Sequence, residues 1–373
     1  MDARRLKESF EHVAMRGHEV ALFFYSDLFL RAPEVRDLFP VSMSAQRDRL
    51  LHALGTIVSD VGNLDSLVPF LRGLGRDHRK FGVVTEYYDT VGASLLATLA
   101  YFSGSNWTDE LEADWKAAYA LAAQVMIEAA KEDEDLHPPW WDATVTSHER
   151  RTFDTAVFRV ALSQRLEYAP GQSVAVESAD CPRTWRFYSM ANAPREDGTL
   201  DFHVRMVDGG MLSSVLARRA GPGSRLRLGP PVGSLTLDTS SRRDILMVAG
   251  STGLAPLKAM VEQVSEMADP PRVHLFFGAR SVEGLYDLPS LEKMAAQYGW
   301  LTVTHAVSGE PEDPRYAGER GMIPDVVSRH GSWREHDAYI CGSAAMVEAT
   351  AGRLGVLGVP RDQIHVEDFG WSS

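Results

Sequence analysis

An arginine, a tyrosine and a serine stand close together in the run Trp185-Arg186-Phe187-Tyr188-Ser189-Met190-Ala191-Asn192. Alternate residues of a strand share one face, so a guanidinium and an aromatic ring can act on the same ligand. Arginine binds phosphate through paired N–H donors, and the face of a tyrosine can line a flat ring system. The run therefore favours a site for a phosphate-bearing cofactor. For these residues alone, an ordinary strand with one surface arginine is an equal alternative.

A glycine-rich turn follows downstream, in Gly209-Gly210-Met211-Leu212-Ser213-Ser214-Val215-Leu216. Two glycines and two hydroxyl residues begin an apolar, helical run, which suits backbone N–H groups that face a pyrophosphate. Together, the two runs resemble the ferredoxin-NADP reductase family of flavoproteins, whose flavin motif is Arg-x-Tyr-Ser-x-x-Asn followed by a glycine-rich turn. The resemblance implies a bound FAD held by Arg186, Tyr188, Ser189, Asn192, Gly209, Gly210, Met211 and Ser213.

A second glycine turn stands in the last third of the chain. The apolar residues 245–249 read as a buried strand and run into Gly250-Ser251-Thr252-Gly253-Leu254-Ala255-Pro256 and then a helical stretch. A strand, a glycine turn and a helix N-terminus together form an anion site. Further apolar strands at 273–278, 301–307 and 338–341, separated by helical stretches, predict an open parallel sheet with its ligand at the carboxyl ends.

The run Cys341-Gly342-Ser343-Ala344-Ala345-Met346-Val347 ends the last of these strands and resembles the second nicotinamide signature of the reductases. Without that resemblance, a cysteine at a strand end would be read as small buried filler. The resemblance implies a coenzyme site made by Gly250, Thr252, Gly253, Pro256, Cys341, Gly342 and Met346.

The choice of coenzyme has two opposing signals. Arg280, after the second strand of the predicted sheet, could hold the 2′-phosphate of NADPH, whereas Tyr286-Asp287-Leu288 is similar to NADH-using relatives. We expect NADH, with NADPH as the alternative. Relatives lay an aromatic residue near the C-terminus against the flavin, and Phe369 matches it; a packing role is the other interpretation.

The first third of the chain has apolar residues at helical spacing from residue 6 to about residue 134, with breaks near residues 32–33, 39–40, 62–63 and 104–105. This pattern predicts a helical bundle or a globin-like domain. His78 stands in a short polar stretch before a helix expected near Thr85. A lone histidine there is more often a surface or capping residue than a metal ligand.

Several neighbouring segments change that interpretation. The runs at residues 22–29, 36–40 and 46–51, and Tyr88-Asp89-Thr90-Val91-Gly92 after His78, resemble bacterial globin segments in order and spacing. With the reductase motifs, the whole chain resembles the flavohaemoglobins. The resemblance implies haem b ligated by His78, Phe39 against the porphyrin, Leu50 closing the oxygen-side pocket, and Tyr25 and Gln46 as polar contacts of bound oxygen.

The same resemblance implies a Tyr and a Glu that support the iron-ligating imidazole by hydrogen bonding, which increases its donation to iron. The matching positions are Tyr88 and Glu132. Glu132 lies in the acidic run at residues 128–135, where a solvated helix end is the alternative and Glu128 is a second candidate. Asp77 precedes His78 where relatives often carry a basic residue.

Composition narrows the class of protein. The chain has 373 residues, 45% of them hydrophobic, which predicts two or three packed domains. A net charge of −13 argues against a nucleic-acid surface. With only two cysteines, Cys181 and Cys341, neither a disulfide framework nor a cysteine-based metal site is indicated. A charged N-terminus and the lack of a long apolar run predict a cytoplasmic protein without a transmembrane segment.

The predicted architecture is an all-α globin domain (1–136), an all-β flavin-binding barrel (137–238) and an α/β parallel-sheet nicotinamide domain (239–373). Resemblance to flavohaemoglobins implies nitric oxide dioxygenation, with nitric oxide, O2 and NAD(P)H as small-molecule partners, in a monomer or weak dimer. Two alternatives stay open: a haem peroxidase or oxygen reductase with the same cofactors, and an FAD-dependent electron-transfer reductase whose helical domain is a sensor or docking module.

Overall fold

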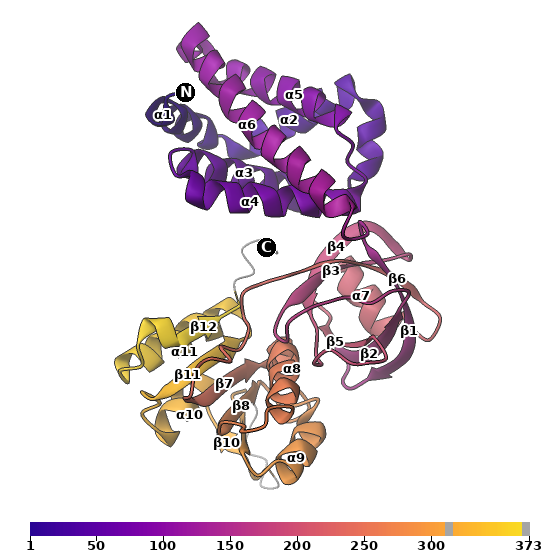
Figure 1. Ribbon diagram of the computed structural model, residues 1–373, viewed down its shortest axis with the longest axis vertical. Helices are drawn as coiled ribbons and strands as arrows, with labels where there is room; N and C mark the ends of the chain where they lie inside the picture. The colour runs from indigo at the N-terminus through magenta and orange to yellow at the C-terminus, as the bar shows by residue number, and fades with distance from the viewer. Residues whose placement is uncertain (310–315, 368–373) are drawn as a thin grey trace. The chain divides into compact units, whose positions relative to one another are not determined.

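The computed structural model describes residues 1–309 and 316–367 and separates into a helical unit, which ends at Trp140, and a second unit, which begins at Trp141. Figure 1 shows the helices of the first unit in indigo and purple. No helix of the described residues is long and apolar enough to cross a bilayer.

The helical unit has six α-helices with short 3₁₀ turns between them. Asp2 caps the first helix by accepting hydrogen bonds from the backbone N–H groups of Arg4 and Arg5, and Thr108 caps the last by accepting from Leu111. Gly104, with φ +53°, ends the fifth helix. The helices are α1 (Ala3–Ala14), α2 (Gly17–Arg31), α3 (Ser44–Asp60), α4 (Leu64–His78), α5 (Glu86–Ser103) and α6 (Asp109–Glu134).

Two separate hydrophobic clusters make up the core of this unit. The larger cluster joins α1, α2, α3, α5 and the first half of α6; it includes Tyr25, and Phe39 and Leu50 pack against it. The smaller cluster joins α4 and α6 around Leu71 and Met126, with Tyr88 packed against it. The expected globin domain is therefore confirmed as a helical fold, and α6 contributes to both clusters of its core.

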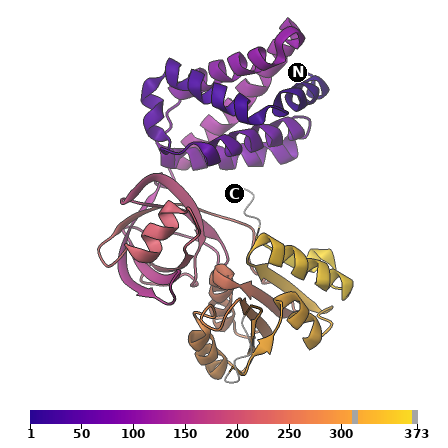
Figure 2. The same ribbon diagram turned by 180° about the vertical axis from the view of Figure 1, so that it is seen from behind.

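The flavin-type barrel is a six-stranded antiparallel sheet in the order β4-β3-β6-β1-β2-β5, and a bridge between Met190 and Phe202 joins its two edges. Helix α7 (Met211–Arg218) covers one end of it through Leu212 and Leu216 (Figure 2). The strands are β1 (Trp141–Arg150), β2 (Thr155–Leu162), β3 (Ser173–Ser178), β4 (Cys181–Ser189), β5 (Thr199–Arg205) and β6 (Arg225–Val232).

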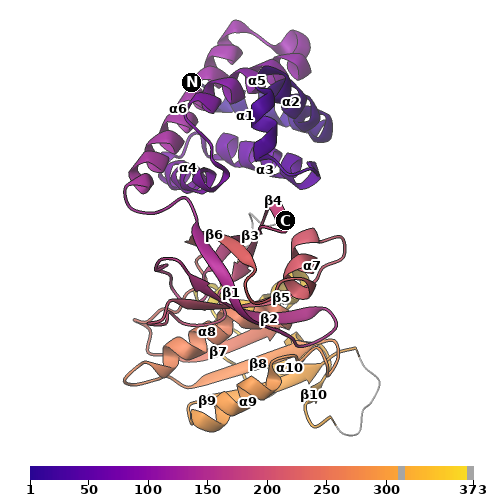
Figure 3. The same cartoon turned by 90° about the vertical axis from the view of Figure 1, so that its right-hand side faces the viewer.

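The last part is a parallel sheet in the order β10-β9-β8-β7-β11-β12. Helices α8 and α9 pack on one face, and α10 and α11 pack on the other (Figures 1 and 3). The direction of the strand order reverses between β7 and β11, which is where sheets of this kind bind ligands. The elements are β7 (Asp244–Gly250), α8 (Leu254–Ser265), β8 (Val273–Ala279), α9 (Leu288–Gln297), β9 (Leu301–Val307), β10 (Glu319–Arg320), α10 (Ile323–His330), β11 (His336–Cys341), α11 (Ala344–Val356) and β12 (Ile364–Val366).

Candidate active site

Three polar side chains from distant parts of the second unit meet at the carboxyl end of β11. Oε1 of Glu367, just after β12, accepts a hydrogen bond from the Ser189 hydroxyl at 3.0 Å. Oε2 of the same carboxylate accepts from the Cys341 thiol at 2.7 Å. Ser189 comes from the barrel and Cys341 from the parallel sheet, so this cluster joins the predicted flavin and nicotinamide elements.

Burial changes the acidity of two members of the cluster. Desolvation raises the pKa of Glu367 to about 7, although the hydrogen bonds from Cys341 and Ser189 oppose the shift. Desolvation and the neighbouring Glu367 raise the pKa of the Cys341 thiol well above its ordinary value. The cluster can therefore hold a proton near neutral pH, and Cys341 is a thiol rather than a reactive thiolate.

The predicted glycine turns meet between β7 and β11. A Cβ added to Gly253 would lie 2.3 Å from the carbonyl oxygen of Cys341, and one added to Gly342 would lie 2.2 Å from Cε of Met346. A Cβ on Gly250 would also meet Met346, at 2.8 Å. These glycines let the two strand ends approach each other closely, which leaves backbone N–H groups at the N-terminus of α8 as the anion-binding element.

Two other predicted coenzyme residues differ in exposure. Thr252 is half-buried in the 3₁₀ turn that precedes α8, and Pro256 is buried in the first turn of that helix. Pro256 therefore shapes the helix start. A site at the β7 turn would rely on backbone groups and on Thr252.

The predicted flavin strand is β4. The Arg186 guanidinium donates to the carbonyl of Trp185 at 2.8 Å and is only partly buried, and Tyr188 packs against the barrel core. Asn192 is fully buried within the barrel. Its amide donates to Tyr168 and to the carbonyls of Ala193 and Thr199, and its oxygen accepts from the Asp201 N–H, so it braces the barrel.

In the predicted pyrophosphate turn, some residues shape the backbone and others face outward. Gly209 has φ +69°, and a Cβ on Gly210 would lie 2.5 Å from the Ser213 hydroxyl, so both positions require glycine. Ser213 is buried, and its hydroxyl donates to the Gly210 carbonyl and accepts from the Val207 N–H. Ser213 therefore fixes the turn. The groups that face outward are the N–H groups at the start of α7 and the exposed Met211.

The residues that resemble those of NADH-using relatives lie inside the protein. Tyr286 and Asp287 are buried where the barrel meets the parallel sheet: the Tyr286 hydroxyl lies 2.8 Å from Nδ1 of His203, and Asp287 pairs with Lys258 at 2.6 Å. A ribose could not reach them without opening this interface. Arg280 is exposed after β8 and keeps its predicted position. Phe369 lies outside the described residues.

In the helical unit, Tyr25 and Gln46, the two residues expected to contact bound oxygen, contact each other. The amide nitrogen of Gln46 donates to the Tyr25 hydroxyl, and that hydroxyl donates to the backbone carbonyl of Gln46, both at 3.3 Å. The ring of Phe39 packs edge-on against Tyr25 with centroids 5.4 Å apart, and burial raises the pKa of Tyr25. Leu50 packs on the same cluster.

His78 is the last residue of α4 and not part of a loop before the next helix, because the apolar pattern from Leu64 continues through it. Its Nδ1 lies 2.7 Å from the Leu74 carbonyl oxygen, and burial lowers its pKa. A carbonyl only accepts, so Nδ1 carries the proton and Nε2 presents a lone pair. A neutral imidazole of this tautomer fits a haem ligand.

The expected support for that imidazole is not formed. Glu132 is ion-paired with Arg72 at the surface of α6, with 57% of its side chain exposed. Glu128 accepts from Gln124 on the same exposed helix face. Tyr88 packs against the α4/α6 cluster, and its backbone carbonyl accepts a hydrogen bond from the Tyr119 hydroxyl. Among the described residues, no hydrogen bond of the Tyr88 hydroxyl is found.

Two residues with evident roles were missed by the sequence reasoning. Glu367 had no signal of its own, because its partners are 178 and 26 residues away in the chain. Arg36 donates to the carbonyls of Phe39, Pro40 and Val41 at 3.1, 3.1 and 3.3 Å and so fixes the corner that carries Phe39. A basic residue shortly before an irregular, proline-containing turn was the available signal.

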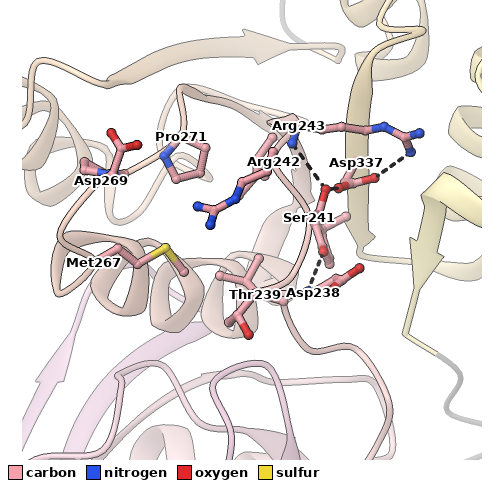
Figure 4. Close-up of a pocket in the computed structure, with 13 residues that line it drawn as sticks. Asp238, Thr239, Ser241, Arg242, Arg243, Met267, Asp269, Pro271 and Asp337 are labelled. Atoms are coloured by element: carbon pink, nitrogen blue, oxygen red, sulfur yellow. Dashed lines mark hydrogen bonds and ion pairs between the residues drawn. The ribbon is translucent and has the colours of Figure 1, made fainter.

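A cavity of about 130 Å³ lies elsewhere, at the amino end of the parallel sheet (Figure 4). It is bounded by the segment between β6 and β7, where Ser241 and Arg243 both bond to the Asp337 carboxylate, and by the turn before β8. Coenzymes of such sheets bind at the carboxyl ends of the strands, so this cavity is separate from the candidate site.

Comparisons with known proteins identify three kinds of domain along the chain. Three family models match in succession: Globin at residues 22–126, the oxidoreductase FAD-binding domain at residues 142–237 and the oxidoreductase NAD-binding domain at residues 247–352. A solved flavohemoglobin from Malassezia yamatoensis, with bound FAD and heme, superposes with a TM-score of 0.79 at 17% identity, over 99% of this chain and 98% of its own.

Curated relatives fall into two groups. The ferredoxin–NAD(P)(+) reductase component of the naphthalene 1,2-dioxygenase/salicylate 5-hydroxylase systems of Ralstonia sp is 34% identical over 68% of this chain and 79% of its own length. A flavohemoprotein of Bacillus subtilis is 24% identical over 98% of this chain and 96% of its own.

Proposed function

Since the chain belongs to the FAD- and NAD-binding oxidoreductase family and carries the globin domain of a flavohaemoprotein, we propose that it is a nitric oxide dioxygenase. In this reaction one nitric oxide and one oxygen molecule, with one electron, give nitrate. A hydride from NAD(P)H carries two electrons and so serves two turnovers. The observation that carries the proposal is the contact between the buried Tyr25 hydroxyl and the Gln46 amide, in the unit that also carries His78.

The haem would supply a site for oxygen and the FAD would divide a hydride into single electrons. The residues of the chain would bind the haem and donate hydrogen bonds to its ligand. Nε2 of His78 is the available ligand atom, and Phe39, held edge-on to Tyr25, offers a flat apolar surface to a porphyrin. The Tyr25 hydroxyl and the Gln46 amide can donate hydrogen bonds to a ligand that gains negative charge.

In the second unit, the start of α8 and the close-packed glycines would bind the coenzyme pyrophosphate, while Arg186 and the start of α7 would bind that of FAD. Glu367 can take up or release a proton near neutral pH at the junction of Ser189 and Cys341, where barrel and sheet meet. The buried contact between His203 and Tyr286 joins barrel and sheet, which orients the two cofactor sites, and the Lys258–Asp287 ion pair fixes the segment that carries Tyr286. Because the exposed Arg280 could bind the 2′-phosphate of NADPH, either NADPH or NADH could be the coenzyme.

The test measures nitrate formed from nitric oxide and oxygen by protein loaded with haem and FAD, with NADH and NADPH in parallel. We expect rapid nitrate formation in the wild type and none in His78→Ala, although that variant should still reduce an artificial electron acceptor. A haem-loaded wild type that makes no nitrate contradicts the proposal.

A second candidate function is electron transfer to a separate protein. The observation that favours it is the 34% identity to a ferredoxin reductase component, against 24% to the flavohemoprotein. In that case the helical unit would be a sensor or docking module. Reduction of a ferredoxin faster than nitrate formation would favour this candidate, and rapid peroxide consumption without nitrate would favour a peroxidase.

A further inference from the structure

The hydrogen bond on the imidazole of His78 decides how strongly that imidazole can donate to a bound iron. A carboxylate partner draws the Nδ1 proton and makes the ring a stronger donor, whereas a backbone carbonyl leaves it a neutral imidazole. In this chain the acceptor is the Leu74 carbonyl oxygen, 2.7 Å away and one helical turn earlier in α4. Among the described residues, this is the recorded hydrogen bond of the ring.

Carboxylates on the facing helix α6 are engaged at its surface. Glu132 is ion-paired with Arg72 of α4, and both side chains are partly exposed, with 33% and 57% of their surfaces accessible for Arg72 and Glu132. Glu128 accepts a hydrogen bond from Gln124, one turn away along the same helix. Arg72 therefore holds Glu132 on the outside of the α4/α6 contact.

The carboxylate beside His78 in sequence is also engaged. Asp77 is ion-paired with Lys80, whose side chain is only 2% exposed. A buried ammonium needs this partner, because an unpaired charge in that position would be costly. Asp77 is thus held by Lys80 and is not directed to the imidazole.

Tyr88 on α5 is the remaining residue that was expected to support the imidazole. The backbone carbonyl of Tyr88 accepts from the Tyr119 hydroxyl of α6, and a Cβ added to Gly92 would lie 2.5 Å from the Tyr119 ring. These contacts fix α5 against α6. The Tyr88 hydroxyl has no recorded partner among the described residues, so it does not relay a carboxylate to His78.

We propose that this chain holds haem through a neutral imidazole supported by the Leu74 carbonyl alone, without the carboxylate support that the flavohaemoglobin resemblance implied. The inference rests on the proposed function and deepens it. Strong donation from the iron ligand favours cleavage of the O–O bond, as in peroxidases. A neutral imidazole favours retention of intact oxygen, so the site is suited to dioxygenation and poorly suited to peroxide reduction.

The test is resonance Raman spectroscopy of the ferrous, haem-loaded full-length protein, which reads the Fe–His stretching band directly. We expect the band at the frequency of histidine-ligated oxygen carriers, below that of peroxidases with a carboxylate-bound histidine. Glu132→Gln, Glu128→Gln and Asp77→Asn should leave the band where it is. Glu134→Gln is the matched control for loss of one charge at the end of α6.

Haem dissociation gives an independent measurement. Loss of a hydrogen-bonding partner of a metal ligand costs about 10-fold to 100-fold in metal affinity. Because Glu132 is not such a partner in this inference, Glu132→Gln should change the rate of haem dissociation by clearly less than about 10-fold. A wild-type Fe–His band in the peroxidase range overturns the inference. So does a band shift in Glu132→Gln, Glu128→Gln or Asp77→Asn that exceeds the shift in Glu134→Gln. Both outcomes leave haem binding, and with it the proposed function, intact. A protein that takes up no haem overturns the proposed function as well.

Discussion

The thiol of Cys341, at the carboxyl end of β11, donates a hydrogen bond of 2.7 Å to Oε2 of Glu367, 26 residues later in the chain. The other oxygen of that carboxylate accepts from Ser189 of the barrel. One side chain thus links the sheet that would hold the hydride donor to the barrel that would hold the flavin. Because it is largely buried, its protonation state is coupled to folding.

The first prediction concerns pH. Burial raises the pKa of Glu367 from its ordinary 4.5 to about 7, so the folded, cofactor-free protein binds more protons than the unfolded chain between these values. The free energy of unfolding should therefore decrease as pH rises through this window, by on the order of 3 kcal/mol at most. Glu367→Gln should remove this component.

The measurement is the melting temperature of wild type and of Glu367→Gln at a series of pH values from below 4.5 to above 7. Glu348→Gln, at an exposed position of α11, is the control. Parallel curves for wild type and Glu367→Gln would show that this carboxyl group does not titrate in the window.

The second prediction concerns bound oxygen. Tyr25→Phe removes one hydroxyl and little volume from the cluster with Gln46 and Phe39. Oxygen should then dissociate faster by a factor that corresponds to about 1–2 kcal/mol, as expected for a hydrogen bond to a charged group. Stopped-flow measurement of oxygen release tests this, and NADH-driven flavin reduction should not change. An unchanged release rate would mean that Tyr25 does not contact the ligand.

Third, His78→Ala should abolish five-coordinate ferrous haem in the absorption spectrum, since Nε2 of His78 carries the lone pair that would bind the iron. Flavin content should stay at the wild-type level. Recovery of the wild-type spectrum on adding free imidazole would support the assignment. Haem bound as in the wild type without imidazole would refute it.

Fourth, Arg186→Ala should weaken FAD binding and leave the haem spectrum intact. The partly exposed guanidinium has one recorded acceptor, the Trp185 carbonyl, and so has donors to spare for a phosphate. Loss of a charge-assisted contact of about 1.5–3 kcal/mol corresponds to roughly 10-fold or more in affinity. Flavin fluorescence titration measures it, with Arg165→Ala on the exposed surface as the control; equal affinities would exclude a phosphate contact.

Fifth, Arg36→Met should loosen the corner that carries Phe39. The guanidinium donates to three successive carbonyls, and it lies over the ring of Phe29, 5.3 Å from its centroid. We expect faster haem loss and an altered ferrous-CO spectrum, partly restored in Arg36→Lys. Arg31→Met removes a nearby arginine that pairs only along its own helix, with Asp27. Identical haem loss in Arg36→Met and Arg31→Met would contradict a role in positioning Phe39.

Local sequence determined much of this protein. The spacing of apolar residues predicted the helical first third, the alternating barrel strands and the parallel sheet, because side-chain periodicity is set by neighbours along the chain. The glycine turns at Gly209 and Gly253 were also predictable, since a positive φ or a close backbone approach restricts the residue type at that position.

Only the tertiary structure decided which polar groups meet. Asn192 belongs to a flavin motif, yet four internal hydrogen bonds hold it inside the barrel, and Tyr286 and Asp287 are buried against the barrel rather than exposed to a coenzyme. Glu132 faces Arg72 and not His78, because the rotation of α6 about its axis depends on packing against α4. Such partners depend on how distant elements pack, and a local pattern of residues does not contain that information.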